Sequence, residues 1–383
     1  MQKAALTFSR WFVGLLFIFS GLIKVNDPLG FGYKLQEYFE VFHVDFLNSW
    51  ATVIAVLLCL MEIVLGALLI FGFWRNVVMR GLLGLIIFFT FLTFVSAYFE
   101  VVTSCGCFGD AIPLTPWQSF SKDLILLILI VYLFLNRAKI EPMTENPRLQ
   151  RALFTIVFVG SLAIGAITYN YLPFIDFLPY KVGANIPELM KLPPGAAADE
   201  YLIMYELKNK KTGEAKVMSD KDYMKLEVWK DDAWEVTGTP EKKLLKKGYD
   251  IKIKDLVIAD ASATDYTKEL IENPYYNLVV VAYDLNHTYE DAIAKINALA
   301  LNAADQFNIR TVLLTSNSAQ DAADFSKRMK LFMEVFYVDP VPLKSMVRAN
   351  PGVLLLKNGV VIGKWHYHNL PSFDRLTEQY FSK

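Results

Sequence analysis

The stretch Val77–Asp110, VVMRGLLGLIIFFTFLTFVSAYFEVVTSCGCFGD, joins a long apolar run to two of the three cysteines in the chain. A membrane-spanning helix needs about 20 apolar residues, which the run supplies. Cys105 and Cys107 follow and are separated by Gly106. A disulfide between them would close a very small ring, and glycine reaches the backbone dihedrals that such a ring demands. The stretch predicts a membrane helix ending in a redox pair, half of a metal site or a structural clasp.

Composition extends the membrane prediction, since 54% of the 383 residues are hydrophobic. The apolar residues concentrate in five runs that are each long enough to cross a bilayer: Ala5–Val25, Trp50–Phe73, Val77–Val102, Trp117–Leu135 and Ala152–Leu172. After Pro173 the composition becomes that of a soluble domain. We therefore expect a membrane helical bundle followed by an α/β domain.

The basic residues of the loops predict the orientation of this bundle, because cytoplasmic loops are rich in Lys and Arg. One side carries Lys3, Arg10, Arg75, Arg80, Arg137, Lys139, Arg148 and Arg151, and the other carries Lys24, Lys34 and Lys122. The amino terminus is then cytoplasmic, and both the cysteine pair and the tail lie outside. We expect a bacterial inner-membrane protein with a periplasmic C-terminal domain, where thiol pairs can be oxidised.

Glu62 is the most costly residue of the membrane part, because it lies near the middle of the second run. A carboxylate there costs several kcal/mol unless it is protonated, paired or hydrated, so it is a functional candidate. Cys59 and Gly66 share its helical face, where Gly66 permits close approach of another helix or of a flat ligand. Cys59 is expected to be an inert buried thiol. If Glu62 relays protons, the Gln variant is expected to keep its melting temperature.

Lys24 ends the first run and is expected to extend to the lipid headgroups, or otherwise to help hold an anion near the thiols. Asp27 and Pro28 can begin a short amphipathic helix over Lys34–Phe39 at the membrane–water boundary.

Three segments of the membrane part resemble the DoxX/MauE group of four-helix membrane proteins, which are associated with thiol redox and sulfur metabolism. They are Ser20-Gly21-Leu22-Ile23-Lys24 with Asp27-Pro28, Glu62-Ile63-Val64-Leu65-Gly66, and Cys105-Gly106-Cys107-Phe108-Gly109. The resemblance implies a four-helix bundle that makes or maintains disulfides in exported proteins. A looser similarity is to vitamin K epoxide reductase and the quinone-linked disulfide oxidases, which makes a quinone one candidate cofactor. This chain lacks their intramembrane Cys-x-x-Cys.

Alternating strand-like and helical segments follow Asp255, and Asn358-Gly359 predicts a hairpin near the end. This order resembles a thioredoxin-like domain, in which Asn350-Pro351 would match the cis-proline beside the active site. Where that family has Cys-x-x-Cys, this chain has Asp284-Leu285-Asn286-His287, and no cysteine follows Cys107. The tail is thus expected to dock a client or partner, with Pro351 and His287 as candidate docking residues. His287 is otherwise a solvated residue at a helix start.

The expected domains are a four-helix DoxX/MauE-like bundle over 1–140, a cytoplasmic linker with the fifth span over 141–173, a linker with a small β-rich segment over 174–254, and the thioredoxin-like domain over 255–383. His366 and His368 are expected on one face of a strand, where no metal is predicted because no third ligand is close in sequence.

The leading hypothesis is a thiol–disulfide oxidoreductase, or an accessory of one, that acts on exported proteins or envelope redox proteins. Cys105 and Cys107 would cycle, while Glu62 and Lys24 would serve proton balance or a bundle-bound electron carrier. One alternative is a non-catalytic assembly factor that anchors a binding module. Another is soft-metal handling by Cys59, Cys105 and Cys107. No nucleic-acid partner is expected.

Overall fold

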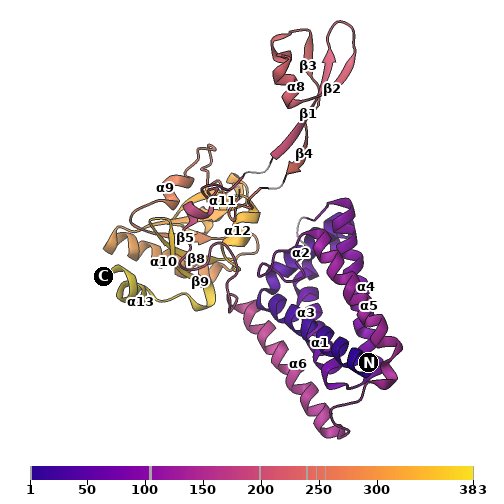
Figure 1. Ribbon diagram of the computed structural model, residues 1–383. Helices are drawn as coiled ribbons and strands as arrows, with labels where there is room; N and C mark the ends of the chain where they lie inside the picture. Colours follow the sequence, from indigo (N-terminus) through magenta and orange to yellow (C-terminus); the bar gives the residue numbers. More distant parts are fainter. Residues whose placement is uncertain are drawn as a thin grey trace. The chain divides into compact units, whose positions relative to one another are not determined.

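The fold is that of a computed structural model (Figure 1), which describes residues 2–102, 106–197, 200–238, 240–246, 248–254 and 256–382. It divides into two compact units. One comprises Met1–Gly183 with Val257–Lys383, and the other comprises Ala184–Leu256.

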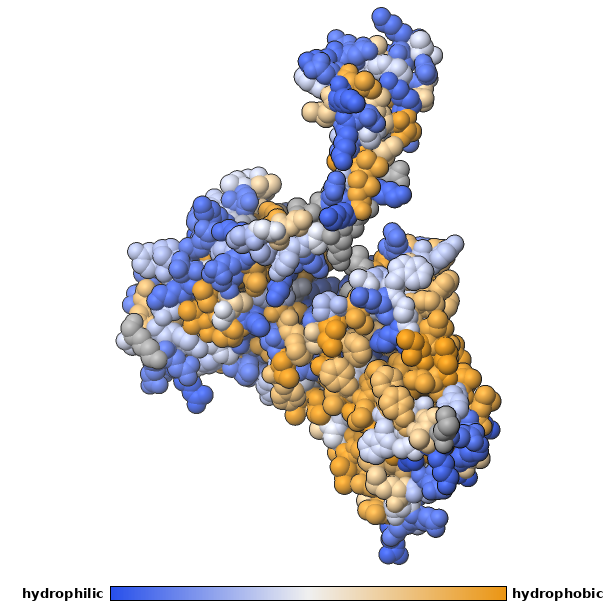
Figure 2. Space-filling view, viewed as in Figure 1, coloured by the Kyte–Doolittle hydropathy of each residue, from blue (hydrophilic) through white to orange (hydrophobic). Residues whose placement is uncertain are grey.

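Within the described residues, five helices are long and apolar enough to cross a membrane, which confirms the predicted bundle. They are α1 (Gln2–Asn26), α3 (Ala51–Phe71, preceded by η1, Asp45–Trp50), α4 (Arg75–Phe99), α5 (Pro116–Leu135) and α6 (Pro147–Asn170). Figure 2 shows hydrophobic residues over much of the visible surface of these helices. Large apolar side chains such as Leu57, Ile87 and Ile128 are exposed there, as expected for a surface that faces lipid.

Glycines set the contact between α1 and α3. A Cβ built on Gly66 would lie 2.7 Å from the carbonyl oxygen of Gly14, and one built on Gly21 would lie 3.0 Å from that of Cys59. The two backbones therefore approach more closely than larger residues permit, which confirms the predicted role of Gly66.

The predicted interfacial helix is α2 (Pro28–Val41), which is longer than expected. The Asp27 side chain accepts a hydrogen bond from the Gly30 backbone N–H, and Pro28 occupies the first turn. Both features begin helices, because they satisfy or remove a backbone donor that has no intrahelical acceptor. A short η2 (Arg137–Lys139) connects α5 toward α6.

The α/β domain is built on a sheet with strand order β7-β6-β5-β8-β9. Its strands are β5 (Tyr276–Val281), β6 (Arg310–Thr315), β7 (Glu334–Tyr337), β8 (Gly352–Lys357) and β9 (Val360–His366). β5, β6 and β7 are parallel, whereas β8 is antiparallel to β5 and to β9. The predicted hairpin joins β8 to β9, with Asn358 and Gly359 both at positive φ.

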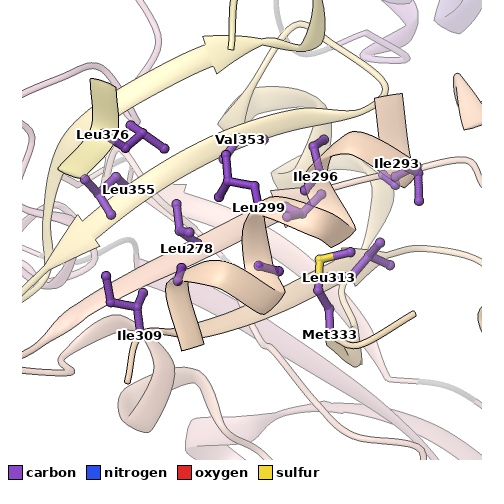
Figure 3. Packing of buried hydrophobic residues seen from close by; sticks show 14 of the residues in the cluster. Leu278, Ile293, Ile296, Leu299, Ile309, Leu313, Met333, Val353, Leu355 and Leu376 are labelled. Carbon is purple, nitrogen blue, oxygen red and sulfur yellow. The ribbon is translucent and has the colours of Figure 1, made fainter. Parts of the chain in front are cut away.

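Helices connect these strands and cover the sheet. They are α9 (Thr267–Ile271), α10 (Glu290–Phe307), α11 (Ala319–Met329), α12 (Pro340–Met346) and α13 (Phe373–Leu376), with η4 (Tyr367–Asn369) and η5 (Thr377–Phe381) near the end. Figure 3 shows the core between α10 and the sheet, where Ile293 and Ile296 pack near Leu313 and Val353. A cis peptide bond joins Asn350 to Pro351 just before β8.

The unit Ala184–Leu256 contains a hairpin formed by β1 (Glu200–Asn209) and β2 (Ala215–Ser219) in antiparallel register. β3 (Trp234–Val236) and β4 (Glu241–Lys246) also pair with β1. The unit further contains α7 (Ile186–Leu189), α8 (Asp220–Lys225) and η3 (Val228–Lys230).

Candidate functional site

The candidate site is built around the turn that carries Cys105 and Cys107. Cys105 lies outside the described residues, and the structure describes the turn from Gly106 onward. Gly106 and Gly109 have φ of +69° and +51°, and the Gly109 N–H donates to the Gly106 carbonyl oxygen at 3.0 Å. Positive φ favours glycine, so these two residues give the turn its shape.

Cys107 is buried and lies at the centre of a polar cluster. Only 8% of the surface of Cys107 is exposed. Its carbonyl oxygen accepts a hydrogen bond from Ser20 Oγ of α1 at 3.0 Å, and its Sγ lies 4.0 Å from Asp123 Oδ2 of α5. The turn is thereby tied to two helices that are remote from it in sequence.

Lys24 and Glu62 form a buried ion pair beside this turn. The Lys24 ammonium also lies over the rings of Phe31 and Phe89, 5.1 Å and 4.6 Å from their centroids. The prediction that Lys24 extends to the headgroups is therefore wrong. Both charges are desolvated, and their mutual attraction is strong at the low local dielectric. Among the described residues, Oε2 of Glu62 has no hydrogen-bond partner.

Lys122 and Asp123 form a second ion pair, in which Asp123 is buried. The Thr93 hydroxyl of α4 donates to Asp123 Oδ2 at 3.1 Å. Lys122 was expected to be a loop charge, and Asp123 was not among the expected site residues. A Lys-Asp dipeptide one turn inside an apolar span was the signal, because a carboxylate at that depth requires a partner.

A small cavity connects the two ion pairs. Its volume is about 20 Å³, and its polar lining comprises Ser20, Lys24, Glu62, Cys107, Lys122 and Asp123. About 10–15 Å³ of solvent-accessible volume is needed to hold one water molecule, so this cavity has room for roughly one. A quinone ring does not fit in this cavity between Lys24 and Cys107.

The sequence of the bundle matches the family described as methylamine utilisation protein MauE, over residues 2–136. The membrane part is similar to MauE. The chain is also similar to Protein TlpB of Flavobacterium psychrophilum, with 31% identity over 135 residues, which are 34% of this chain and 36% of that protein. It thus spans about a third of the length of this relative. No solved structure matches the chain significantly.

A larger cavity of about 430 Å³ lies on the other side of the turn of the MauE-like bundle. Its lining includes Gly106 and Asp110 of the turn, Asp27 at the start of α2, and Lys344 and Arg348 of the α/β domain. Both cavities therefore border the same short segment of chain, and Lys24 lines both of them.

Arg348 links the two sides of this larger cavity. Its guanidinium donates to Asp27 Oδ2 at 2.8 Å and to Asp110 Oδ2 at 3.2 Å, although its side chain is only 6% exposed. Burial raises the pKa of the Asp110 carboxyl, and the positive charge of Arg348 opposes that rise. Arg348 could not be recognised as a site residue from the sequence, because its partners are 321 and 238 residues away.

The candidate docking residues lie at one end of the sheet of the α/β domain. His287 Nδ1 is 2.7 Å from Asp284 Oδ2, and its side chain is 84% exposed. Asn350 Nδ2 donates to the Asp284 carbonyl oxygen at 2.7 Å, so the loop before α10 contacts the residue preceding Pro351. This end of the domain combines an exposed imidazole with an ordered loop.

His366 and His368 do not share a strand face as expected, because His366 ends β9 and His368 lies in η4. Their ring centroids are 4.8 Å apart. Desolvation lowers the pKa of His366 to about 4, so this ring is neutral at physiological pH.

Within the described ranges, no group of three or more His, Cys, Asp and Glu side chains could hold a metal ion. Cys105 lies outside those ranges. The hypothesis of soft-metal binding by the three cysteines therefore stays a prediction.

Proposed function

We propose that the protein is an inner-membrane thiol–disulfide redox protein, or an accessory of one, that acts on exported proteins through Cys105 and Cys107. In this function the pair cycles between dithiol and disulfide, and a partner forms a transient mixed disulfide with one of the two thiols. The excess of Lys and Arg in the loops of the opposite side supports a periplasmic location of the pair, and that compartment is oxidising. A reporter active only in that compartment should work after residue 108, but not after Arg75.

The observation that carries this proposal is the contact of Cys107 with a cluster of buried charges. Four ionisable side chains, Lys24, Glu62, Lys122 and Asp123, line one small cavity together with this cysteine. Ionisable residues inside a membrane protein are costly and are commonly functional. An inert clasp has no need of charged groups beside its sulfur, whereas thiol exchange needs proton acceptors and donors.

The α/β domain suits the role of a thioredoxin-like docking module. Strands of mixed direction and the cis peptide bond before Pro351 agree with that resemblance. The domain contains no cysteine, so it carries no electrons by thiol chemistry. Arg348 reaches Asp110, three residues after Cys107, and a client held by the domain is thereby kept close to the thiols.

The test follows the redox state of the pair in cells. Acid quenching followed by alkylation with a mass-shifting maleimide should report two oxidised cysteines, which become reactive after an added reductant. One of the two variants, Cys105→Ser or Cys107→Ser, should accumulate a reducible covalent adduct with a partner, because that variant keeps the attacking thiol and lacks the resolving one. Cys59→Ser is the matched control, since Cys59 is fully buried in α3 and should form no adduct.

The second candidate is a non-catalytic assembly factor, which the buried Arg348 contacts favour because they fix a domain without thiols to the bundle. In that case both single-cysteine variants keep full activity and no adduct forms. This result would reject the redox proposal.

A further inference from the structure

We propose that Cys107 is the resolving thiol of the pair and that Asp123 takes up its proton. This inference rests on the proposed redox function. The two cysteines, which the sequence does not distinguish, then have different roles: Cys105 attacks and Cys107 resolves. Asp123 becomes a catalytic residue that was not recognised from the sequence.

Because Cys107 is buried, it is not the thiol that attacks the disulfide of a partner. The residue is 8% exposed, and its sulfur faces the cavity between the helices of the bundle. A partner's disulfide must align with the attacking sulfur, which a buried sulfur beside Asp123 cannot offer. The first attack therefore belongs to Cys105, and Cys107 closes the intramolecular disulfide.

The contact with Asp123 supplies the base. Asp123 Oδ2 lies 4.0 Å from Cys107 Sγ, within the range of a sulfur hydrogen bond, and the thiol is the donor. A thiol must lose its proton before it attacks, because the thiolate is the nucleophile. The carboxylate is the acceptor in direct contact with this sulfur.

The surroundings keep Asp123 in place. The Thr93 hydroxyl from α4 donates to the same oxygen, Oδ2, and Lys122 from α5 pairs with Oδ1. Across the cavity, α1 contributes Lys24 and α3 contributes Glu62. The thiol is thus faced, from the described elements, by two cations and two carboxylates. When a proton moves from the Cys107 sulfur to Asp123, the total charge of these four side chains and Cys107 does not change.

The resolving step exchanges one disulfide bond for another. In a mixed disulfide between Cys105 and a partner, the Cys107 proton moves to Asp123, and the Cys107 sulfur forms a bond to the Cys105 sulfur. The bond from Cys105 to the partner breaks, and the partner's sulfur leaves as a thiolate that then takes a proton. Two electrons pass from the cysteine pair to the partner's disulfide. In the reverse direction, Asp123 returns its proton to Cys107.

A chromogenic aromatic disulfide, 5,5′-dithiobis(2-nitrobenzoate), resolves the two stages on the full-length protein in detergent, after the protein has been reduced and the reductant removed. Attack by the first thiol releases one coloured thiolate, and closure of the intramolecular disulfide releases the second. In a Cys59→Ala background, we expect both phases in the parent. The second phase should be lost in Cys107→Ser, and both should be lost or very slow in Cys105→Ser.

Asp123→Asn should slow the second phase by roughly 10²-fold at neutral pH, the scale of general base catalysis, and leave the first phase unchanged. The rate of its second phase should then rise about tenfold per pH unit, because the thiolate must form by loss of its proton to solvent. Asp123→Glu should recover part of the rate. Asp45→Asn, in η1 outside the cluster, is the matched control.

Parental second-phase kinetics in Asp123→Asn, or a fast first phase in Cys105→Ser, would overturn the inference while leaving the redox function intact. Absence of both phases in the parent would instead reject the redox function. If Asp123→Asn does not elute as a folded protein, the pH profile of the parent decides. A parental second phase that accelerates about tenfold per pH unit around neutral pH means that the Cys107 thiol loses its proton to solvent, and this result also overturns the inference.

Discussion

Glu62 and Lys24 are each other's charged partners inside the bundle, and this pairing changes what a substitution at Glu62 should do. Glu62→Gln leaves the Lys24 ammonium buried beside a neutral amide. Breaking a buried ion pair by removing one charge costs about 3–5 kcal/mol, because the remaining charge is uncompensated. We therefore expect a clear fall in the melting temperature in detergent, where the sequence alone predicted almost none.

The matched control for this prediction is Glu37→Gln. Glu37 pairs with Lys34 in α2, where the two side chains are 44% and 26% exposed. An exposed pair contributes about 1 kcal/mol or less, so the control should melt close to the parent. The double variant Lys24→Met with Glu62→Gln should recover much of the lost stability. A Glu62→Gln variant that melts like the parent would show that the pair contributes no stability.

At the residue scale, the sequence identified the costly groups but not their partners. Glu62 was recognisable because a carboxylate in an apolar run is unusual. Its pairing with Lys24 depends on how α1 crosses α3, and sequence spacing does not reveal that crossing. Asp123 was equally recognisable, yet the neighbouring Lys122 made it resemble the end of a loop.

At the scale of elements, the crossing of α1 and α3 depends on glycine. Gly66→Ala places a methyl group 2.7 Å from the Gly14 carbonyl oxygen, so the helices must separate or bend. Overpacking of this kind costs about 1–3 kcal/mol. We expect a lower melting temperature, and a faster alkylation of Cys59, which lies on the same helix face.

Gly84→Ala is the control for this helix crossing. A Cβ at Gly84 in α4 meets no described atom within 4 Å, so the added methyl group should not lower stability. Equal melting temperatures of the Gly66 and Gly84 variants would contradict the close-packing argument.

Elements with strong local signals were predictable. The five spans follow from their apolar length, α2 from Asp27 and Pro28, and the β8–β9 turn from Asn358-Gly359. The position of His368 was not, because β9 ends at His366 and the chain turns into η4. Alternation along a strand cannot show where that strand ends.

At the scale of the whole molecule, the sequence showed a membrane bundle and an α/β domain, but not that Arg348 joins them. The fold class follows from composition and from the alternation of strands and helices. The Arg348 contacts join positions more than 200 residues apart. In the sequence, Arg348 resembles an ordinary surface arginine. Its contacts follow only from the packing within the single unit that Met1–Gly183 and Val257–Lys383 form together.

The Arg348 contacts predict that the α/β domain restrains the cysteine turn. Arg348→Met removes the only guanidinium that pairs with Asp27 and Asp110 among the described ion pairs, and it keeps an unbranched side chain. Removing one charge of a fully buried pair costs about 3–5 kcal/mol, and the loss here is smaller because Asp27 and Asp110 are 18% and 51% exposed. The restraint on residues 106–110 should then weaken, while β5 and β8 stay folded because their own core is untouched.

Hydrogen exchange measured by mass spectrometry tests this restraint. The amide of Gly109, bonded to the Gly106 carbonyl oxygen, should exchange at least about tenfold faster in Arg348→Met, since a loss of 1.4 kcal/mol already gives that factor. Peptides from β5 and β8 should keep parental protection. Arg328→Met is the control, because Arg328 forms an exposed pair with Glu290. Unchanged exchange over residues 106–110 in Arg348→Met would mean that the α/β domain does not hold the turn, and the coupling of client docking to the thiols would lose its structural basis.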